Sequence, residues 1–215
     1  MTTDHSSRPH TTLDSLWVPQ PNSKKLILVA HGRGDSYDGF RWLPEALGLN
    51  VNYLMVNAPD KYYGGYSWYD MAPNQEPGIR RSRAALDQLL QEIQDYGFAA
   101  GDVLYFGFSQ GCLMGLEWGG RTSLKLAGYV GISGYAFNER KLDEEKHEAG
   151  QSVPWLITHG TADSALPYER TAGQIRFLQE KGWPIQFETF SKDHTIDPVD
   201  ELALLRSWID KALSN

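Results

Sequence analysis

The sequence predicts an α/β protein with a mostly parallel central sheet and helices on both faces of the sheet. Short apolar runs alternate along the chain with longer amphipathic stretches. Several runs lack alternation of apolar and polar residues, which is typical of strands buried on both faces. The chain has 215 residues, of which 41% are hydrophobic and 22% charged. We therefore expect residues 1–215 to form a single domain with one continuous core.

Six apolar runs are expected to be strands of the central sheet. They are Lys25–Ala30, Val51–Val56, Val103–Phe106, Leu126–Ile132, Trp155–Thr158 and Ile185–Phe190. Leu13–Val18 is a candidate edge strand. Ile79–Tyr96 has apolar residues at helical spacing and is followed by Gly97, so it is expected to be a helix. Pro167–Lys181 and Pro198–Leu213 are expected to be helices with a proline near the first turn.

The charge and composition of the chain indicate which kinds of partner and which cellular compartment to expect. The net charge is −7 and no basic cluster is present, so neither nucleic acid nor an anionic membrane surface is an expected partner. Residues 1–12 are expected to be a flexible polar leader without a signal peptide, and no run is long enough to span a bilayer. The single cysteine, Cys112, excludes an internal disulfide and is expected to be buried. We expect a cytoplasmic protein without stable membrane insertion.

Ser109 has the sequence context of a nucleophile elbow. It lies in Gly107-Phe108-Ser109-Gln110-Gly111, directly after the strand Val103–Phe106. A strand that turns sharply into a helix exposes the serine at the apex, and the flanking glycines permit the close approaches that this turn requires. An ordinary glycine-rich turn can have the same pattern, which arises by chance about 0.1 times in such a chain. The prediction therefore depends on the residues that accompany it.

A serine nucleophile requires a histidine to accept its proton and a carboxylate to orient that histidine. His194 follows the last predicted strand, where a loop can carry it over Ser109, and it is the expected general base. Asp163 follows the preceding strand and is the expected acid. The order Ser109, Asp163, His194 is the one found in α/β-hydrolases.

The other histidines and acids are expected to have structural roles. His159 precedes Gly160 and is expected to pack at that turn, while His5 and His10 lie in the leader. Asp193 and Asp197 are rival acids, but carboxylates so near His194 more often cap a loop. The charge run 141–148, which contains His147, is expected to be a solvated helix or loop and not a metal site.

The loop after the first central strand is expected to supply an oxyanion hole. Its sequence is His31-Gly32-Arg33-Gly34-Asp35, and its glycines allow backbone N–H groups to turn inward. We assign the two donors to the backbone N–H groups of Arg33 and Gln110, and expect His31 to hold the loop. The loop lacks the glycine spacing and the lysine of a nucleotide site.

The segment 60–78 is aromatic and rich in glycine. We expect an irregular loop that walls an apolar substrate site, with Tyr66 and Trp68 as substrate contacts. The alternative is that these rings only cap the core beneath a long loop.

These motifs together resemble the phospholipase/carboxylesterase family of α/β-hydrolases, which includes acyl-protein thioesterases and small bacterial carboxylesterases. The resemblance covers most of the chain. It rests on five motifs: His31-Gly32-Arg33-Gly34-Asp35-Ser36, Ser67-Trp68-Tyr69-Asp70, the 107–111 elbow, His159-Gly160-Thr161-Ala162-Asp163 running on to Leu166-Pro167, and His194. It implies hydrolysis of esters or thioesters through an acyl-enzyme, with neither a cofactor nor a metal. Leu166 joins the expected substrate contacts, and the resemblance also implies that a homodimer can form.

Three residues depart from the family pattern. Arg33 replaces a usually apolar residue, Cys112 replaces a second glycine, and Asp193 replaces a glycine before the histidine. The Arg33 guanidinium can attract an acidic substrate or pair with a nearby carboxylate, and we favour the pairing. Cys112 is displaced from the apex, which disfavours a cysteine-dependent hydrolase.

The sequence leaves three functions to compare. The favoured one is a serine carboxylesterase for short to medium acyl chains. The second is an acyl-protein thioesterase or lysophospholipase that acts on long acyl chains. The third is a binding protein that kept the fold without catalysis, whose natural signature would be the loss of a triad residue, and the sequence retains all three.

Overall fold

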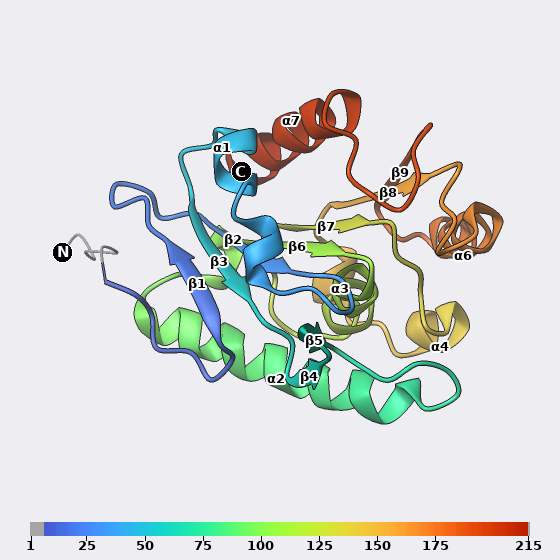
Figure 1. Ribbon diagram of the computed structural model, residues 1–215, viewed down its shortest axis with the longest axis horizontal. Helices are drawn as coiled ribbons and strands as arrows, with labels where there is room; N and C mark the ends of the chain where they lie inside the picture. The colour runs from blue at the N-terminus through green and yellow to red at the C-terminus, as the bar shows by residue number, and fades with distance from the viewer. Residues whose placement is uncertain (1–6, 215) are drawn as a thin grey trace.

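A central sheet organises the computed structural model, which describes residues 7–214 (Figure 1). Within these residues, seven strands pair in the order β1-β3-β2-β6-β7-β8-β9. Their bounds are β1 Ser15–Val18, β2 Leu26–Ala30, β3 Asn52–Val56, β6 Val103–Phe108, β7 Gly128–Ile132, β8 Trp155–Gly160 and β9 Ile185–Phe190. Only the pairing of β1 with β3 is antiparallel. The predicted α/β class with a mostly parallel sheet is confirmed.

Helices cover both faces of this sheet. The α-helices are α1 Leu43–Leu47, α2 Gln75–Tyr96, α3 Gln110–Gly119, α4 Glu139–Glu144, α5 Glu148–Gln151, α6 Tyr168–Glu180 and α7 Asp200–Ser214, and the 3-10 helices are η1 Tyr37–Phe40 and η2 Ala100–Asp102. Buried residues of α1 and α7 share one core cluster, and those of α2, α3 and α6 share the other. Figure 1 shows α1 and α7 above the sheet and α2 below it.

The alternating side chains of β2 show how one strand serves both cores. Leu26, Leu28 and Ala30 belong to the cluster under α2 and α3, whereas Ile27 and Val29 belong to the cluster under α7. All five are buried. A strand that buries both faces must be apolar at every position, which explains the unbroken apolar run in the sequence.

The expected elements are present with shifted ends. Leu13–Val18 was expected at an edge, and β1 lies there as Ser15–Val18. The helix expected from Ile79 begins earlier, at Gln75, and the strand expected to end at Phe106 continues to Phe108. The short α1 has no counterpart among the predicted helices, and α4 and α5 occupy most of the predicted charge run.

The segment 60–78 is more regular than expected. It contains a hairpin of β4 Asp60–Tyr62 and β5 Gly65–Ser67, followed by the start of α2. The hairpin is joined to the loop after β2: Gly34 N–H donates to Tyr66 O at 2.8 Å, and Tyr66 N–H donates to Asp35 O at 2.9 Å. These backbone bonds between distant segments order the hairpin.

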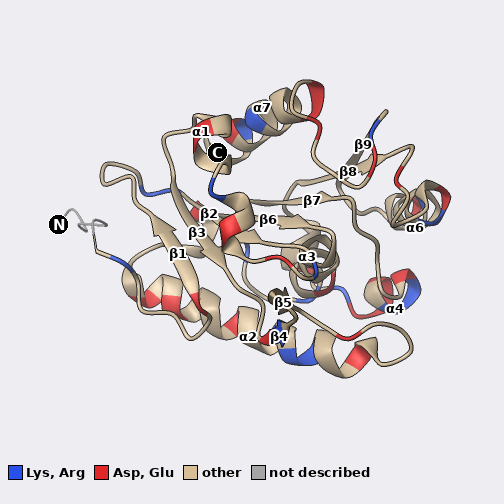
Figure 2. Ribbon diagram, in the orientation of Figure 1, with Lys and Arg blue, Asp and Glu red and all other residues tan. Residues whose placement is uncertain are grey.

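The predicted leader is described only from residue 7 onward, so residues 1–6 lie outside the described residues. At its end, Thr12 N–H donates to Glu92 on α2 at 2.9 Å. Acidic and basic residues both occur along α2 (Figure 2). Across residues 7–214, no helix combines the length and the apolar character needed to cross a membrane.

Candidate active site

Ser109 stands between β6 and α3 with a strained backbone. Its φ is 53° and its ψ is −111°, in a region that residues other than glycine rarely occupy. The turn is too tight for side chains on either flank. A Cβ at Gly107 would lie 2.3 Å from the carbonyl oxygen of Gly111, and a Cβ at Gly111 would lie 2.2 Å from that of Ala30. The two glycines thus permit the geometry that presents the Ser109 hydroxyl.

The structure brings His194 and Asp163 to this hydroxyl. His194 Nε2 lies 3.0 Å from Ser109 Oγ, and His194 Nδ1 lies 2.8 Å from Asp163 Oδ2. An ionised carboxylate only accepts hydrogen bonds, so Nδ1 carries the proton and Nε2 is left to accept the hydroxyl proton. The Phe108 ring lies 5.1 Å from the imidazole, centroid to centroid, and limits its movement on one side.

The Asp163 carboxylate is held by its own loop. Its side chain is fully buried, and Oδ1 accepts from the N–H groups of Ala165 at 3.0 Å and Leu166 at 2.8 Å. Oδ2 is therefore left for His194. Because backbone donors fix the carboxylate in place, it can orient the imidazole without moving.

His159 lies close to Asp163 but has a different role. Its Nε2 is 3.6 Å from Asp163 Oδ2 and donates to Leu166 O at 2.9 Å. Burial lowers the pKa of His159, which keeps the ring neutral. The expected packing role agrees with this position.

The rival acids cap loops, as expected. Asp193 Oδ1 accepts from the N–H groups of Ser164 and His194, and from the Ser164 hydroxyl. Asp197 Oδ1 accepts from the N–H groups of Val199 and Asp200 at the start of α7. Neither carboxylate has a described hydrogen bond to the His194 ring.

The backbone of Arg33 and Gln110 flanks Ser109. A Cβ at Gly32 would lie 3.2 Å from the Ser109 Cβ, so the loop after β2 passes directly beside the serine. Gln110 is the first residue of α3, where N–H groups have no partner within the helix. Among the described residues, neither N–H donates a hydrogen bond outside the regular elements. These two N–H groups remain the expected donors to an oxyanion.

His31 holds this loop from beneath. It is buried, its Nε2 accepts from Ala58 N–H at 3.0 Å, and its Nδ1 lies 2.6 Å from Gly32 O. Burial lowers the pKa of His31, so the ring is neutral. The predicted structural role is confirmed.

A cavity of about 300 Å³ opens at the Ser109 hydroxyl. Its lining combines apolar and aromatic residues with polar and charged ones: Gly32, Arg33, Asp35, Tyr69, Met71, Phe108, Ser109, Gln110, Tyr135, Ala165, Leu166 and His194. The predicted contact Leu166 lies here. Tyr66 and Trp68 are not among the residues that line this cavity.

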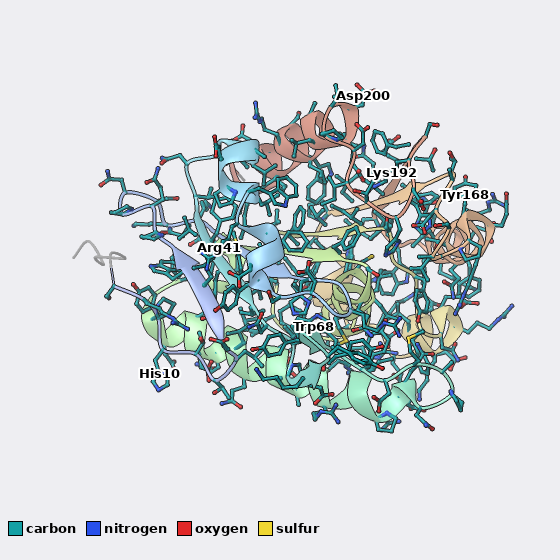
Figure 3. The ribbon with its side chains drawn as sticks, viewed as in Figure 1. His10, Arg41, Trp68, Tyr168, Lys192 and Asp200 are labelled. Atoms are coloured by element: carbon teal, nitrogen blue, oxygen red, sulfur yellow. The ribbon has the colours of Figure 1, made fainter. Side chains whose placement is uncertain are left out.

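Trp68, labelled in Figure 3, is fully buried. Its indole N–H donates to His31 O at 3.0 Å. Tyr66 packs beside the core, and its hydroxyl accepts from Lys61 at 2.9 Å. Their neighbours Tyr69 and Met71 line the cavity instead. The segment 60–78 therefore reaches the cavity through Tyr69 and Met71.

Gln110 has a second role that the sequence analysis missed. Its side-chain Oε1 accepts from Trp68 N–H at 2.9 Å and from the Ser67 hydroxyl at 3.1 Å, while its Nε2 donates to Tyr69 O at 2.9 Å. The buried amide thereby joins the segment 67–69 to the start of α3. A glutamine in the elbow was the only signal of this contact.

Arg33 is not paired with a carboxylate, contrary to the favoured expectation. No ion pair of Arg33 occurs among residues 7–214, and its guanidinium carbon lies 5.3 Å from the Tyr62 ring centroid. The nearest acid in sequence, Asp35, instead accepts from Ser36 N–H at 2.7 Å and packs against Gly39. Arg33 lines the cavity with its guanidinium near the Tyr62 ring of the hairpin, at a distance that permits a cation–π contact.

Cys112 is fully buried behind the elbow. Burial raises the pKa of its thiol to about 12, so the thiolate is scarce near neutral pH. This agrees with the expected packing role. The described part of the chain also has no group of three His, Cys, Asp or Glu side chains arranged to hold a metal ion.

A parallel sheet with a strained serine between a strand and a helix defines an α/β-hydrolase. The sequence profile described as phospholipase/carboxylesterase matches residues 15–213. The chain therefore belongs to the phospholipase/carboxylesterase family. This confirms the expected resemblance, and with it the prediction of an enzyme that hydrolyses esters or thioesters.

Individual relatives agree with this assignment. Acyl-protein thioesterase 1 of Yarrowia lipolytica is 33% identical over 161 residues, covering 66% of this chain and 71% of that protein. The crystal structure of esterase PE8 matches with a TM-score of 0.81 at 23% identity, covering 94% of this chain and 99% of the other. Acyl-protein thioesterase 2 of Zea mays matches with a TM-score of 0.78 at 26% identity, covering 93% and 99%.

Proposed function

We propose that the protein is a serine carboxylesterase for short to medium acyl chains, with Ser109 as nucleophile, His194 as general base and Asp163 as the orienting acid. The observation that carries the proposal is the continuous set of contacts from Ser109 Oγ to His194 Nε2 at 3.0 Å, and from His194 Nδ1 to Asp163 Oδ2 at 2.8 Å. Both distances are those of hydrogen bonds: the first lets the Ser109 hydroxyl proton pass to Nε2, and the second holds the imidazole in the orientation that accepts it.

The first half of the proposed reaction forms an acyl-enzyme. His194 Nε2 takes the Ser109 proton while Oγ attacks the ester carbonyl carbon, and Asp163 stabilises the imidazolium that results. The carbonyl oxygen becomes an oxyanion, which accepts hydrogen bonds from the backbone N–H groups of Arg33 and Gln110. His194 then gives its proton to the alcohol oxygen as the carbon–oxygen bond breaks.

The second half releases the acid. Water takes the place of the alcohol and loses a proton to His194 Nε2 as it attacks the acyl carbon. The second tetrahedral intermediate collapses, the bond to Oγ breaks, and Ser109 regains its proton from His194. No described step needs a cofactor.

The cavity supports the preference for shorter acyl chains. Its volume of about 300 Å³ lies at the lower end of the range for ligand pockets. Among the lining residues, Tyr69, Met71, Tyr135 and Leu166 offer apolar contacts for an acyl chain, and Arg33 and Asp35 are polar. A short acyl group is expected to fit without displacing side chains.

The second candidate is an acyl-protein thioesterase or lysophospholipase that acts on long acyl chains. Relatives named acyl-protein thioesterase favour it. Such a substrate requires a longer apolar channel than the described cavity, and so an outward movement of lining side chains such as Met71, which is exposed. A binding protein without catalysis is disfavoured, because the serine, histidine and aspartate are in hydrogen-bond contact.

The proposal is tested with p-nitrophenyl esters from acetate to palmitate, alongside matched oxygen and thioester substrates. Ser109-dependent turnover that falls with chain length supports the carboxylesterase. An optimum at long chains, or a marked preference for the thioester, supports the thioesterase. Absence of turnover together with no labelling of Ser109 by a fluorophosphonate leaves the binding protein.

The remaining expectations stay predictions. They are a cytoplasmic location, a small-molecule substrate, the absence of nucleic acid and membrane partners, and the possible homodimer.

A further inference from the structure

A buried ion pair lies beneath the loop that carries His194. Lys192 Nζ is 2.6 Å from Glu201 Oε1 and 2.5 Å from Oε2. The two side chains are 3% and 0% exposed. Lys192, labelled in Figure 3, follows β9. Glu201 is in the first turn of α7. The proposed chemistry uses neither residue, and burying two charges requires compensation for their lost hydration.

The pair is saturated with hydrogen bonds. The third proton of the Lys192 ammonium is available to Thr195 O, at 2.7 Å. Glu201 Oε1 also accepts from the Thr158 hydroxyl at 2.5 Å, and Oε2 also accepts from Asp197 N–H at 2.7 Å. The carboxylate thus joins β8, the loop after β9 and the start of α7.

These contacts fix the chain just before and just after His194 in the sequence. Lys192 lies two residues before it, and Thr195, whose carbonyl binds the same ammonium, directly follows it. The loop is also pressed against the end of β8: a Cβ at Gly160 would lie 2.3 Å from Lys192 O, and Ala162 N–H donates to that oxygen at 3.2 Å. The backbone around His194 therefore has little room to shift.

We infer that Lys192 and Glu201 are positioning residues that fix the imidazole of His194 between Ser109 and Asp163. The inference rests on the proposed function. A buried ion pair often stabilises a fold no better than apolar residues of similar size, but its directional hydrogen bonds specify one arrangement. Here the specified arrangement is that of the loop from which His194 reaches Ser109 Oγ at 3.0 Å. A misplacement of about 1 Å at such a site can cost roughly 10²-fold in rate.

The test is the double variant Lys192→Met/Glu201→Gln, which removes both charges and keeps similar side-chain shapes. Lys25→Met is the matched control, because Lys25 pairs with Asp102 at 2.7 Å before β2 and β6, at the opposite end of the strands from Ser109. The measurements are kcat and KM for p-nitrophenyl butyrate, the thermal midpoint, and the proton NMR resonance of the His194 Nδ1–H group.

The expected result is a folded double variant whose kcat falls by about 10- to 100-fold while KM changes by less than about twofold. The Nδ1–H resonance is expected to shift or broaden. Lys25→Met should change neither the kcat nor the resonance. A folded double variant with wild-type kcat and an unchanged resonance overturns the inference.

Two further readouts keep the inference testable. If the double variant does not fold, Lys192→Met alone decides by the same criteria, because Glu201 then keeps its hydrogen bonds from the Thr158 hydroxyl and Asp197 N–H. If the wild-type protein hydrolyses no ester, the proposed function fails. The imidazole resonance, which is read without substrate, still tests the positioning.

Discussion

Asp193 joins the loop that carries Asp163 to the loop that carries His194. Its Oδ1 lies 2.8 Å from both the backbone nitrogen and the hydroxyl oxygen of Ser164, and 2.7 Å from the His194 backbone nitrogen. These bonds lower the pKa of the Asp193 carboxyl below its usual value, led by the bond from Ser164 N–H. The departure from the family pattern at this position thus ties the proposed acid to the proposed base.

This tie predicts a pH-dependent stability difference between the wild type and Asp193→Asn. A carboxyl whose pKa is lowered by folding contributes stability above its unfolded pKa of about 3.9, and loses it as the pH falls through the folded pKa. The wild type should therefore have the higher thermal midpoint at pH 7, and the difference should shrink towards zero below pH 3. A difference that stays constant down to pH 2.5 would contradict the assigned hydrogen bonds.

Ser109→Ala should lower kcat by a factor on the order of 10⁴ or more without unfolding the protein. Ser109→Gly should be equally inactive but more stable than the alanine variant by about 1 kcal/mol, because glycine accepts a φ of 53° without strain. Chemical denaturation of the two variants measures the difference. Equal stability would show that the backbone at residue 109 relaxes.

His194→Ala and His159→Ala separate the proposed base from its buried neighbour. We expect His194→Ala to lower kcat by a factor on the order of 10⁴ with little effect on the thermal midpoint. His159→Ala should lower the thermal midpoint, since it empties a fully buried position that bonds Leu166 O. The reverse pattern would move the general base to His159.

Arg33→Leu should change kcat/KM for p-nitrophenyl butyrate by less than about threefold. The proposed oxyanion donor is the backbone N–H of residue 33, which leucine retains, whereas loss of a donor costs about 10² to 10³ in kcat. A decrease of that size on this neutral ester would assign the effect to the guanidinium. Lys61→Leu, on the neighbouring hairpin, is a suitable control for the loss of a nearby cation.

Cys112 should resist iodoacetamide in the native protein and react after denaturation. Its pKa is raised to about 12 by burial, so both the scarcity of thiolate and the lack of access oppose alkylation. Mass spectrometry of treated protein counts the adducts, and esterase activity should be unaffected. Rapid native alkylation with loss of activity would argue for an open route to the back of the elbow.

The fold and the contacts of Ser109 could be predicted because they depend on local pattern and chain order. Apolar runs such as Leu26–Ala30 indicated buried strands, and the carboxyl ends of parallel strands meet at one edge of the sheet. Residues that follow those ends, such as Asp163 and His194, were therefore expected near Ser109. Sheet order brings together His194 and Ser109, which are 85 positions apart in the sequence.

The sequence does not indicate which way a side chain points in the segment 60–78, so the residues that line the cavity could not be predicted. Trp68 and Tyr69 are adjacent aromatic residues, and no periodicity in a short irregular segment indicates which one reaches the cavity. The indole N–H of Trp68 finds a buried partner at His31 O, which draws that ring into the core. The burial of Lys192 could not be predicted either, because a lysine in a loop is usually solvated. Its partner Glu201 comes close only because α7 packs on the sheet.

The most direct test of the central claim is intact-mass and peptide mass spectrometry after reaction with a fluorophosphonate. We expect a single covalent adduct on Ser109 in the wild type, loss of esterase activity in proportion to labelling, and no adduct in the Ser109→Ala variant. An adduct at another residue, or near-normal ester hydrolysis by Ser109→Ala, would contradict the assignment of Ser109 as the nucleophile.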